Sequence, residues 1–274
     1  MTIKEYVINK KLEIKNQVSS LKVVPHFVII QINEDEASNA YVRGKMKDAD
    51  EVGILCTLIK LPIDTSEEEL LSKIDEVNKD KSIHGLIVQM PLPNHINEEK
   101  VKLAVDPKKD IDGFHPLSLL DPCTPKGIIN YLKDEHYQIL GKNAVVIGRS
   151  NIVGKPMSVL LSQKGWDCTV TLCHSKTKNL ETVCASADIL IAALGTPGFV
   201  KANMVKEGAV VIDVGTTRVT DATRERGWRL CGDVMFDEVS PKCSYITPVP
   251  GGVGPMTICS LMINTLQAAK GKKA

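Results

Sequence analysis

Three short runs of Val, Ile and Leu interrupt the first ninety residues, and longer segments of mixed polarity separate them. The runs cover residues 26–32, 54–61 and 83–90. Their length and composition are typical of β-strands. The segments between them have the length and the spacing of amphipathic helices. The order β-α-β-α-β therefore predicts a parallel α/β sheet with right-handed crossovers.

Both segments between these strands carry helix signals. We expect the first helix over residues 38–52, with Ser38 as its N-terminal cap and Gly53 as its stop. Ser66 and Glu69 have the spacing of a capping box, which predicts the start of the second helix.

The second half of the chain repeats the alternation after a change of composition. Residues 91–125 are rich in Pro, Asp and turn residues, which indicates a domain boundary. Beyond it, apolar runs predict strands over residues 143–148, 168–173, 187–194 and 208–215. Proline-opened helices are expected over residues 155–165 and 255–271.

These elements predict two α/β domains with a cleft between them. We expect the first domain over residues 1–118, completed by the C-terminal segment 249–274. The second domain is expected over residues 119–248. At 274 residues, 43% of them hydrophobic, the chain can bury cores of this size.

Charge and cysteine content narrow the classes of partner. The net charge is +1, so no global field favours nucleic acid or an anionic membrane surface. No apolar run approaches the roughly 20 residues of a membrane span, and the first residues lack a signal-peptide core. We therefore expect a cytoplasmic protein that binds neither. The eight cysteines form no C-x-x-C pair, which favours reduced, buried thiols over a zinc site or a disulfide framework.

The segment VVIGRSNIVGKP, residues 145–156, places Gly148 after a predicted strand and Gly154 at the start of a helix. Glycines at such a turn let the backbone approach a pyrophosphate, whose charge then meets backbone N–H groups and the helix dipole. The spacing departs from G-x-G-x-x-G because Arg149 and Ser150 follow the first glycine. An ordinary strand-to-helix turn is therefore an equal alternative.

The end of the next predicted strand bears on the choice of nucleotide. A site selective for NAD has an Asp or Glu there, on the ribose 2′-hydroxyl. Residues 174–176 instead read His-Ser-Lys. The Ser175 hydroxyl and the neighbouring cation, with Arg149 nearby, would suit the 2′-phosphate of NADP. A solvated polar loop is the alternative.

Tyr41 and Lys45 stand four residues apart, so they share one side of the helix expected there. Such a pair is more often a surface feature than a site. Two residues favour a functional interpretation: Gln89 at a strand end and Asp112 in the segment KKDIDGFHP. Ligands of parallel α/β sheets bind beyond the carboxyl ends of strands, where Gln89 should lie. Both could also be ordinary strand-end or turn residues.

The Y-x-x-x-K spacing also occurs in the short-chain dehydrogenases. In those enzymes the pair follows the nucleotide loop, whereas here it precedes Gly148 by about a hundred positions. The order of the motifs argues against that family.

Taken together, nine ordered segments resemble the bifunctional methylenetetrahydrofolate dehydrogenase/cyclohydrolase family. They are YVRGK (41–45), VQMPLP (88–93), DIDGFHP (110–116), PCTPKG (122–127), VVIGRSNIVGKP (145–156), CHSKT (173–177), VIDVGTTRV (211–219), GDV (232–234) and TPVPGGVGPMT (247–257). The resemblance extends from about Pro25 to about Leu266. Agreement of so many blocks in one order makes coincidence far less probable than any single motif does.

The resemblance implies a role for each candidate residue. Lys45 would be the catalytic amine and Gln89 would hold it, while Tyr41 packs on the folate ring system and Asp112 hydrogen-bonds the pterin. Further folate contacts are implied for Val88, Met90, Pro250, Gly251, Gly252, Val253 and Gly254. Contacts to NADP are implied for Gly148, Arg149, Ser150, Gly154, Ser175 and Thr216.

The resemblance also implies the activity and the assembly. The N-terminal domain would be the folate-binding catalytic domain, and the second a Rossmann-like NADP-binding domain. The enzyme would oxidise 5,10-methylenetetrahydrofolate and hydrolyse the methenyl product to 10-formyltetrahydrofolate. It would act as a homodimer and would need no metal.

Three features depart from the family pattern. Asn33 stands where a glycine is usual after the first strand, Thr216-Thr217 replaces a usual Ile-Asn, and the leader before Pro25 is short. These departures concern cofactor contacts and N-terminal packing rather than the chemistry.

Two other functions stay open from the residues alone. One is a monofunctional, NAD-dependent methylenetetrahydrofolate dehydrogenase, which would not hydrolyse the methenyl compound. The other is a non-catalytic NADP-binding sensor. The joint presence of Tyr41, Lys45, Gln89 and Asp112 argues against the sensor, because hydrolysis needs an acid/base group and nucleotide binding does not.

Overall fold

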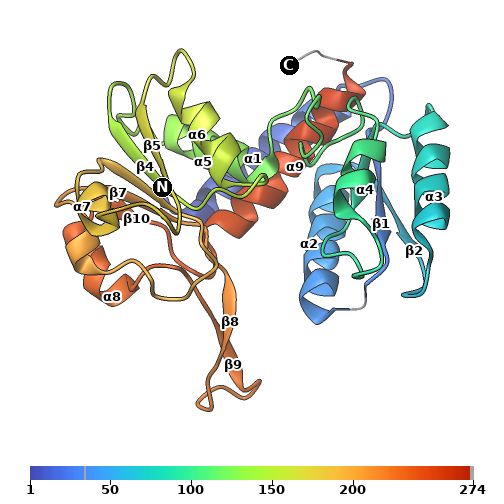
Figure 1. Cartoon of the computed structure of the whole chain (residues 1–274). Helices are drawn as coiled ribbons and strands as arrows, with labels where there is room; N and C mark the ends of the chain where they lie inside the picture. Colours follow the sequence, from blue (N-terminus) through green and yellow to red (C-terminus); the bar gives the residue numbers. More distant parts are fainter. Residues whose placement is uncertain (34, 272–274) are drawn as a thin grey trace. The chain divides into compact units, whose positions relative to one another are not determined.

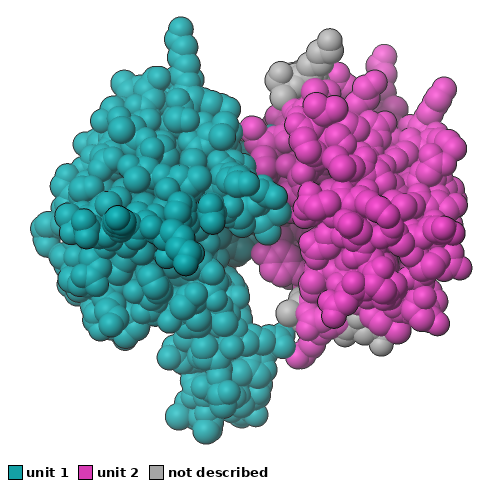
Figure 2. Space-filling view, in the orientation of Figure 1, with its two compact units in different colours: residues 1–4, 124–257 teal, residues 5–123, 258–274 magenta. Residues whose placement is uncertain are grey.

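The computed structural model describes residues 1–33 and 35–271, and these form two compact units (Figure 2). Among the described residues, unit 1 contains 1–4 and 124–257, and unit 2 contains 5–33, 35–123 and 258–271. Each unit is built on a parallel sheet, which confirms the prediction of a two-domain α/β protein. The functional domain bounds inferred at residues 118 and 249 remain a prediction.

Unit 2 is built on three parallel strands in the order β2–β1–β3. The strands are β1 (His26–Gln31), β2 (Leu55–Lys60) and β3 (Gly85–Val88). The helices that contribute to this unit are α1 (Ile3–Ser19), α2 (Glu36–Val52), α3 (Glu67–Lys79), α4 (Glu98–Ala104) and α9 (Val253–Ala269). The predicted β-α-β-α-β order is therefore confirmed for β1 to β3.

The central strand β1 is buried on both faces. Phe27 and Ile29 pack in one core with residues of α1, α2 and α9. Val28 and Ile30 point to the other face and pack in a second core with residues of α3 and α4. Because helices cover both faces, every position from Phe27 to Ile30 is apolar, and the strand shows no polar alternation.

Helix α2 begins two residues before the predicted start. Asp35 is its N-terminal cap, and the Asp35 side chain accepts a hydrogen bond from the backbone N–H of Ser38. The assignment of Ser38 as the cap was therefore wrong, because an earlier residue with an equally suitable side chain takes that place. The predicted stop is confirmed, since Gly53 closes the helix in the left-handed conformation with φ of 80°.

Unit 1 is built on five parallel strands in the order β10–β7–β6–β4–β5. The strands are β4 (Asn143–Ile147), β5 (Thr169–Cys173), β6 (Ile189–Ala192), β7 (Val210–Asp213) and β10 (Tyr245–Ile246). The helices are α5 (Cys123–Asp134), α6 (Gly154–Ser162), α7 (Leu180–Ala185) and α8 (Phe236–Val239), with 3₁₀ turns at Ala202–Met204 and Ser240–Lys242. Because β5 and β6 lie on opposite sides of β4, the strand order reverses there, which is where ligands of such sheets bind.

An antiparallel hairpin projects from the body of unit 1 (Figure 1). It pairs β8 (Thr217–Thr220) with β9 (Trp228–Cys231). The guanidinium groups of Arg218, on β8, and Arg226, in the connecting segment, lie over the Trp228 ring, 4.2 and 4.4 Å from its centroid. This hairpin was not predicted from the sequence.

All eight cysteines are free thiols, and five of them are buried. The expectation of buried thiols therefore holds for five of the eight, whereas Cys56, Cys231 and Cys243 are partly exposed. None of the helices in the described part of the chain is long and apolar enough to cross a membrane.

Candidate active site

Lys45 lies inside unit 2 with 7% of its surface exposed, and its Nζ donates a hydrogen bond of 3.2 Å to Oε1 of Gln89. Gln89 directly follows β3, and its backbone N–H donates to the carbonyl of Ile30. Its side-chain amide nitrogen donates to the carbonyl of Met90 at 2.8 Å. Since that bond occupies the NH₂ group, the amide oxygen is oriented towards the amine.

Tyr41 stands one helical turn before Lys45 on α2, and 42% of its surface is exposed. The same side of the helix therefore runs from the surface at Tyr41 to the interior at Lys45. Burial around the hydroxyl, together with the charge of Asp112, raises the pKa of Tyr41 above its ordinary value. Tyr41 is thus a neutral phenol at physiological pH, with an accessible ring.

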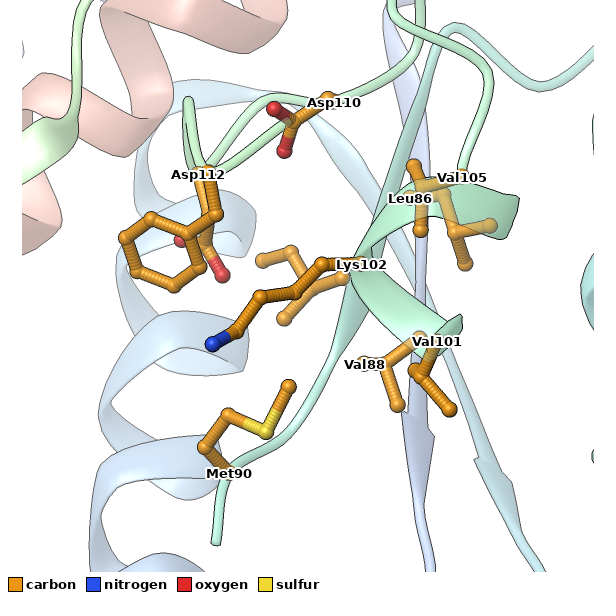
Figure 3. Close-up of a pocket in the computed structure, with 10 residues that line it drawn as sticks. Leu86, Val88, Met90, Val101, Lys102, Val105, Asp110 and Asp112 are labelled. Carbon is orange, nitrogen blue, oxygen red and sulfur yellow. The ribbon is translucent and has the colours of Figure 1, made fainter. Parts of the chain in front are cut away.

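Asp112 and Met90 line the same pocket of unit 2, with Val88 forming part of its apolar wall (Figure 3). Phe114 and the side chain of Lys102 also line this pocket. The Lys102 amine is 2.9 Å from a carboxylate oxygen of Glu99 on the same helix. The lining of the pocket thus combines apolar side chains with the carboxylates of Asp110 and Asp112.

The loop that carries Asp112 is organised by a second carboxylate, Asp110. Its two oxygens accept hydrogen bonds from the backbone N–H groups of Gly113, at 3.1 Å, and His115, at 2.7 Å. Burial raises the pKa of Asp110 to about 6; the bond from His115 opposes this shift, and the nearby Asp112 charge adds to it. Asp110 was not predicted as a site residue. The signal was present in the D-I-D pattern, where the buried Ile111 separates two polar residues.

The nucleotide loop of unit 1 is closed around two glycines. Gly148 has φ of 111°, and a Cβ placed on it would lie 2.1 Å from the carbonyl oxygen of Ala193. A Cβ on Gly154 would lie 1.9 Å from the carbonyl oxygen of Gly148. The loop therefore needs glycine at both positions. Since Gly148 follows β4 and Ala193 follows β6, the close approach lies where the strand order reverses.

The Ser150 hydroxyl accepts hydrogen bonds from the backbone where α6 begins. Its Oγ accepts hydrogen bonds from the backbone N–H groups of Val153, at 3.1 Å, and Gly154, at 3.3 Å. Arg149 beside it is exposed. A helix N-terminus, a hydroxyl and an exposed cation together fit the phosphates of a dinucleotide.

The other predicted cofactor residues lie on exposed loops of unit 1. Ser175 follows β5 in a turn closed by a hydrogen bond of 2.9 Å from the His174 N–H to the Thr177 hydroxyl. Thr216 is exposed between β7 and the hairpin. No acidic residue stands within this turn, so the observed loop keeps the features expected of a 2′-phosphate site.

Two buried aspartates, which were missed as individual residues, shape the same end of the sheet. Asp233 accepts hydrogen bonds of 2.6 to 3.0 Å from the backbone N–H groups of residues 194–196, directly after β6. The Asp213 carboxylate in turn accepts the N–H of Asp233 at 2.9 Å. Burial raises the pKa of Asp213 to about 6, although that bond opposes the shift. The GDV motif thus fixes the loop after β6.

The predicted folate residues 250–254 belong to unit 1, whereas Tyr41, Lys45, Gln89 and Asp112 belong to unit 2. Within unit 1, a Cβ on Gly252 would lie 2.3 Å from the carbonyl oxygen of Pro248. Gly251 has φ of 94°, which favours glycine. The loop therefore depends on its glycines for its own conformation.

These features define a two-domain nucleotide-dependent enzyme. One unit has a glycine loop where the strand order of its parallel sheet reverses, and the other α/β unit holds a buried amine. The family model for the catalytic domain of tetrahydrofolate dehydrogenase/cyclohydrolase matches residues 2–112. The model for the NAD(P)-binding domain of the same family matches residues 122–273. The chain therefore belongs to the tetrahydrofolate dehydrogenase/cyclohydrolase family. The resemblance recognised from the sequence motifs is confirmed.

Relatives of known name are similar over nearly the whole chain. The "Bifunctional protein FolD" of Porphyromonas gingivalis is 55% identical over 258 residues, covering 90% of this chain and 87% of that protein. A crystal structure of the bifunctional FolD enzyme from Campylobacter jejuni is 41% identical, with a TM-score of 0.92 over 98% of this chain and 97% of that one. The Trypanosoma brucei enzyme, solved with NADP and an inhibitor, is 34% identical, with a TM-score of 0.93 over 99% and 97%.

Proposed function

We propose that the chain catalyses two consecutive reactions on a folate-bound one-carbon unit. The first is the NADP-dependent oxidation of 5,10-methylenetetrahydrofolate to 5,10-methenyltetrahydrofolate. The second is the hydrolysis of that product to 10-formyltetrahydrofolate. The observation that carries the proposal is the buried amine of Lys45, hydrogen-bonded to a neutral amide, in a chain that matches both domains of the family.

The oxidation step needs positioning more than proton transfer. A hydride leaves the methylene carbon, and no proton has to be removed at that centre. Bound NADP supplies the hydride acceptor. The nucleotide loop of Gly148, Arg149, Ser150 and Gly154 would hold its phosphates, and Ser175 with Thr216 would complete the site. The exposed Arg149 and Ser175 support selection of NADP over NAD, because they suit an added phosphate.

The hydrolysis step needs an acid/base group. Water must lose a proton as it attacks the methenyl carbon, and the ring nitrogen must gain one as its bond to that carbon breaks; one proton is released overall. Lys45 is suited to this transfer because it is buried and its partner, Gln89, carries no charge. A carboxylate in place of the amide would favour the charged form of the amine.

The remaining residues of unit 2 would orient the substrate. The accessible ring of Tyr41 offers a face for the folate ring system. Asp112, in the lining of the pocket that contains Val88 and Met90, can accept hydrogen bonds from the N–H groups of the pterin. The glycine loop at residues 250–254 would contribute further folate contacts.

Two broader properties belong to the same proposal. The enzyme would be cytoplasmic, and it would act as a homodimer without nucleic acid or membrane as a partner. The near-neutral net charge supports the lack of an electrostatic attraction to either surface.

One spectrophotometric experiment tests the function. The protein is mixed with methylenetetrahydrofolate and NADP, and NADPH formation and the methenyl chromophore are followed together. We expect NADPH to form and the methenyl signal to decay faster than in buffer alone. An NAD-only reaction, or a methenyl signal that decays at the buffer rate, would contradict the proposal.

A further inference from the structure

Asn264 is a fully buried polar residue in the apolar helix α9. Its side-chain NH₂ group donates to the carbonyl of Ile111 at 2.8 Å and to the carbonyl of Asp121 at 3.0 Å. Buried amides are costly unless they are paired, so the two bonds account for a polar group at this depth. Both acceptors lie on the loop that carries Asp112.

The two acceptors stand on opposite arms of this loop. Ile111 directly precedes Asp112, and Asp121 lies at the end of the returning arm. The arms touch, because the N–H of Cys123 donates to the carbonyl of Asp112 at 3.3 Å. A Cβ on Gly113 would lie 2.6 Å from the backbone nitrogen of Pro122. Asn264 therefore joins the arms at the base of a closed loop.

This geometry calls for a side chain with two donors. Two carbonyl oxygens face the same point, and an amide NH₂ group can donate to both. A carboxylate would place negative charge against both oxygens, and an aliphatic side chain would leave both without this partner. Asp110 holds the same loop by the opposite chemistry, since its carboxylate accepts the N–H groups of Gly113 and His115.

We propose that Asn264 is a positioning residue of the folate site: its amide holds the loop in the conformation that presents Asp112 to the pterin. Asn264 does not touch the substrate; it acts through the backbone on either side of Asp112. The inference rests on the proposed role of Asp112 in binding folate.

The test compares Asn264→Leu with Thr265→Val in the full-length protein. Thr265 is the matched control, because it is equally buried on the same helix and its hydroxyl donates within that helix, to the carbonyl of Leu261. We expect Asn264→Leu to raise the KM for methylenetetrahydrofolate about tenfold, as the loss of two hydrogen bonds would allow. The KM for NADP should stay unchanged, and Thr265→Val should change neither. Asn264→Ser, whose hydroxyl has a single donor, is the milder variant should the leucine variant fail to fold.

A second comparison separates positioning from general stability. Asp112→Asn is combined with Asn264→Leu, or with Asn264→Ser where that variant is used. If Asn264 acts through Asp112, the double variant should have nearly the folate KM of Asp112→Asn alone. Two outcomes would overturn the inference about Asn264 and leave the proposed role of Asp112 intact. One is full additivity of the two effects on the folate KM in the double variant. The other is an unchanged folate KM in a folded Asn264 variant while Asp112→Asn raises the folate KM. An unchanged KM in Asp112→Asn would instead overturn the proposed role of Asp112, and the inference with it.

Discussion

The amine nitrogen of Lys45 and the amide oxygen of Gln89 lie 3.2 Å apart inside unit 2, with less than a tenth of either residue exposed. The partner of the amine is therefore neutral and has a fixed orientation. Two variants test what each member of this pair contributes.

Replacing Lys45 by Met should remove the acid/base group and keep the volume of the side chain. We expect the cyclohydrolase rate to fall by about 10²–10⁴-fold, the usual contribution of such a group, while NADP-dependent oxidation stays measurable. Decay of the methenyl chromophore and formation of NADPH report the two activities separately. Lys47→Met, at an exposed position of the same helix, is the control. Equal losses of both activities in a folded Lys45→Met protein would contradict this division of labour.

Replacing Gln89 by Glu should place a negative charge beside the amine. The carboxylate stabilises the protonated amine, so hydrolysis at neutral pH should fall and recover at higher pH. The measurement is the pH profile of methenyl hydrolysis. Gln89→Met, which removes the hydrogen bond without adding charge, should lower the rate without moving the profile. A profile for Gln89→Glu that coincides with that of the wild type would show that the charge of the partner is unimportant.

Arg149→Ala and Ser175→Ala test the selection of NADP. Each removes a group suited to the 2′-phosphate, so the KM for NADP should rise about tenfold while that for NAD changes little. Steady-state assays with both nucleotides give the comparison. Lys155→Ala, another exposed cation near the loop, is the control. Parallel changes for the two nucleotides would exclude Arg149 and Ser175 from phosphate recognition.

Gly148→Ala tests the close approach in the nucleotide loop. The added Cβ would lie 2.1 Å from the carbonyl oxygen of Ala193, so the loop must shift and NADP binding should be lost. Gly165→Ala is the matched control: its φ of 99° is also positive, but no described atom lies within 4 Å of the added carbon. We expect that control to cost only the backbone strain, about 1–3 kcal/mol of unfolding free energy. NADP titration and urea unfolding distinguish the two, and normal NADP affinity in Gly148→Ala would refute the argument.

His84→Asn tests a pH-dependent contact at the amino end of the unit 2 sheet. The His84 Nδ1 accepts a hydrogen bond of 3.1 Å from the backbone N–H of His26. Burial, followed by the positive charges of His26 and Lys109, lowers the pKa of His84 below its ordinary value of 6.5. The unfolded chain thus takes up the proton more readily. The stability that this contact adds is complete above pH 6.5 and is lost as the pH falls below it.

The asparagine oxygen can replace Nδ1 as the acceptor and does not titrate. The variant should therefore lose less unfolding free energy than the wild type between about pH 7.5 and about pH 5. Urea unfolding at the two pH values measures this, with His136→Asn as the control. Identical losses in the wild type and His84→Asn would show that His84 does not contribute to the pH dependence.

The sequence predicted the elements whose signals are local. The apolar runs became all the strands of both parallel sheets except β10, which was not predicted. The capping box of Ser66 and Glu69 is present with both of its hydrogen bonds. Helix α1 was missed, because its charged positions hide the buried residues Ile14 and Val18. The β8–β9 hairpin was missed because its strands are short and partly polar.

The candidate site was predictable to a similar extent. Lys45 and Gln89 could be proposed as a pair from their motifs, and the structure brings the two side chains within hydrogen-bonding distance. Asp110, Asp233 and Asn264 could not be recognised individually. Asp233 and Asn264 bond to backbone groups that are distant in sequence, and Asp110 bonds to the backbone of its own folded loop. Only the tertiary structure brings these groups together.

The hydrogen bonds that Ser150 accepts where α6 begins have a consequence for ligand affinity. Two N–H groups at the start of α6 already have an oxygen partner before any phosphate arrives. Binding of an anion there exchanges one acceptor for another and does not rescue unsatisfied donors. Because these bonds already hold the loop, anion binding requires little further ordering of the backbone. The net free-energy gain from the two donors is nevertheless modest, because one hydrogen bond replaces another.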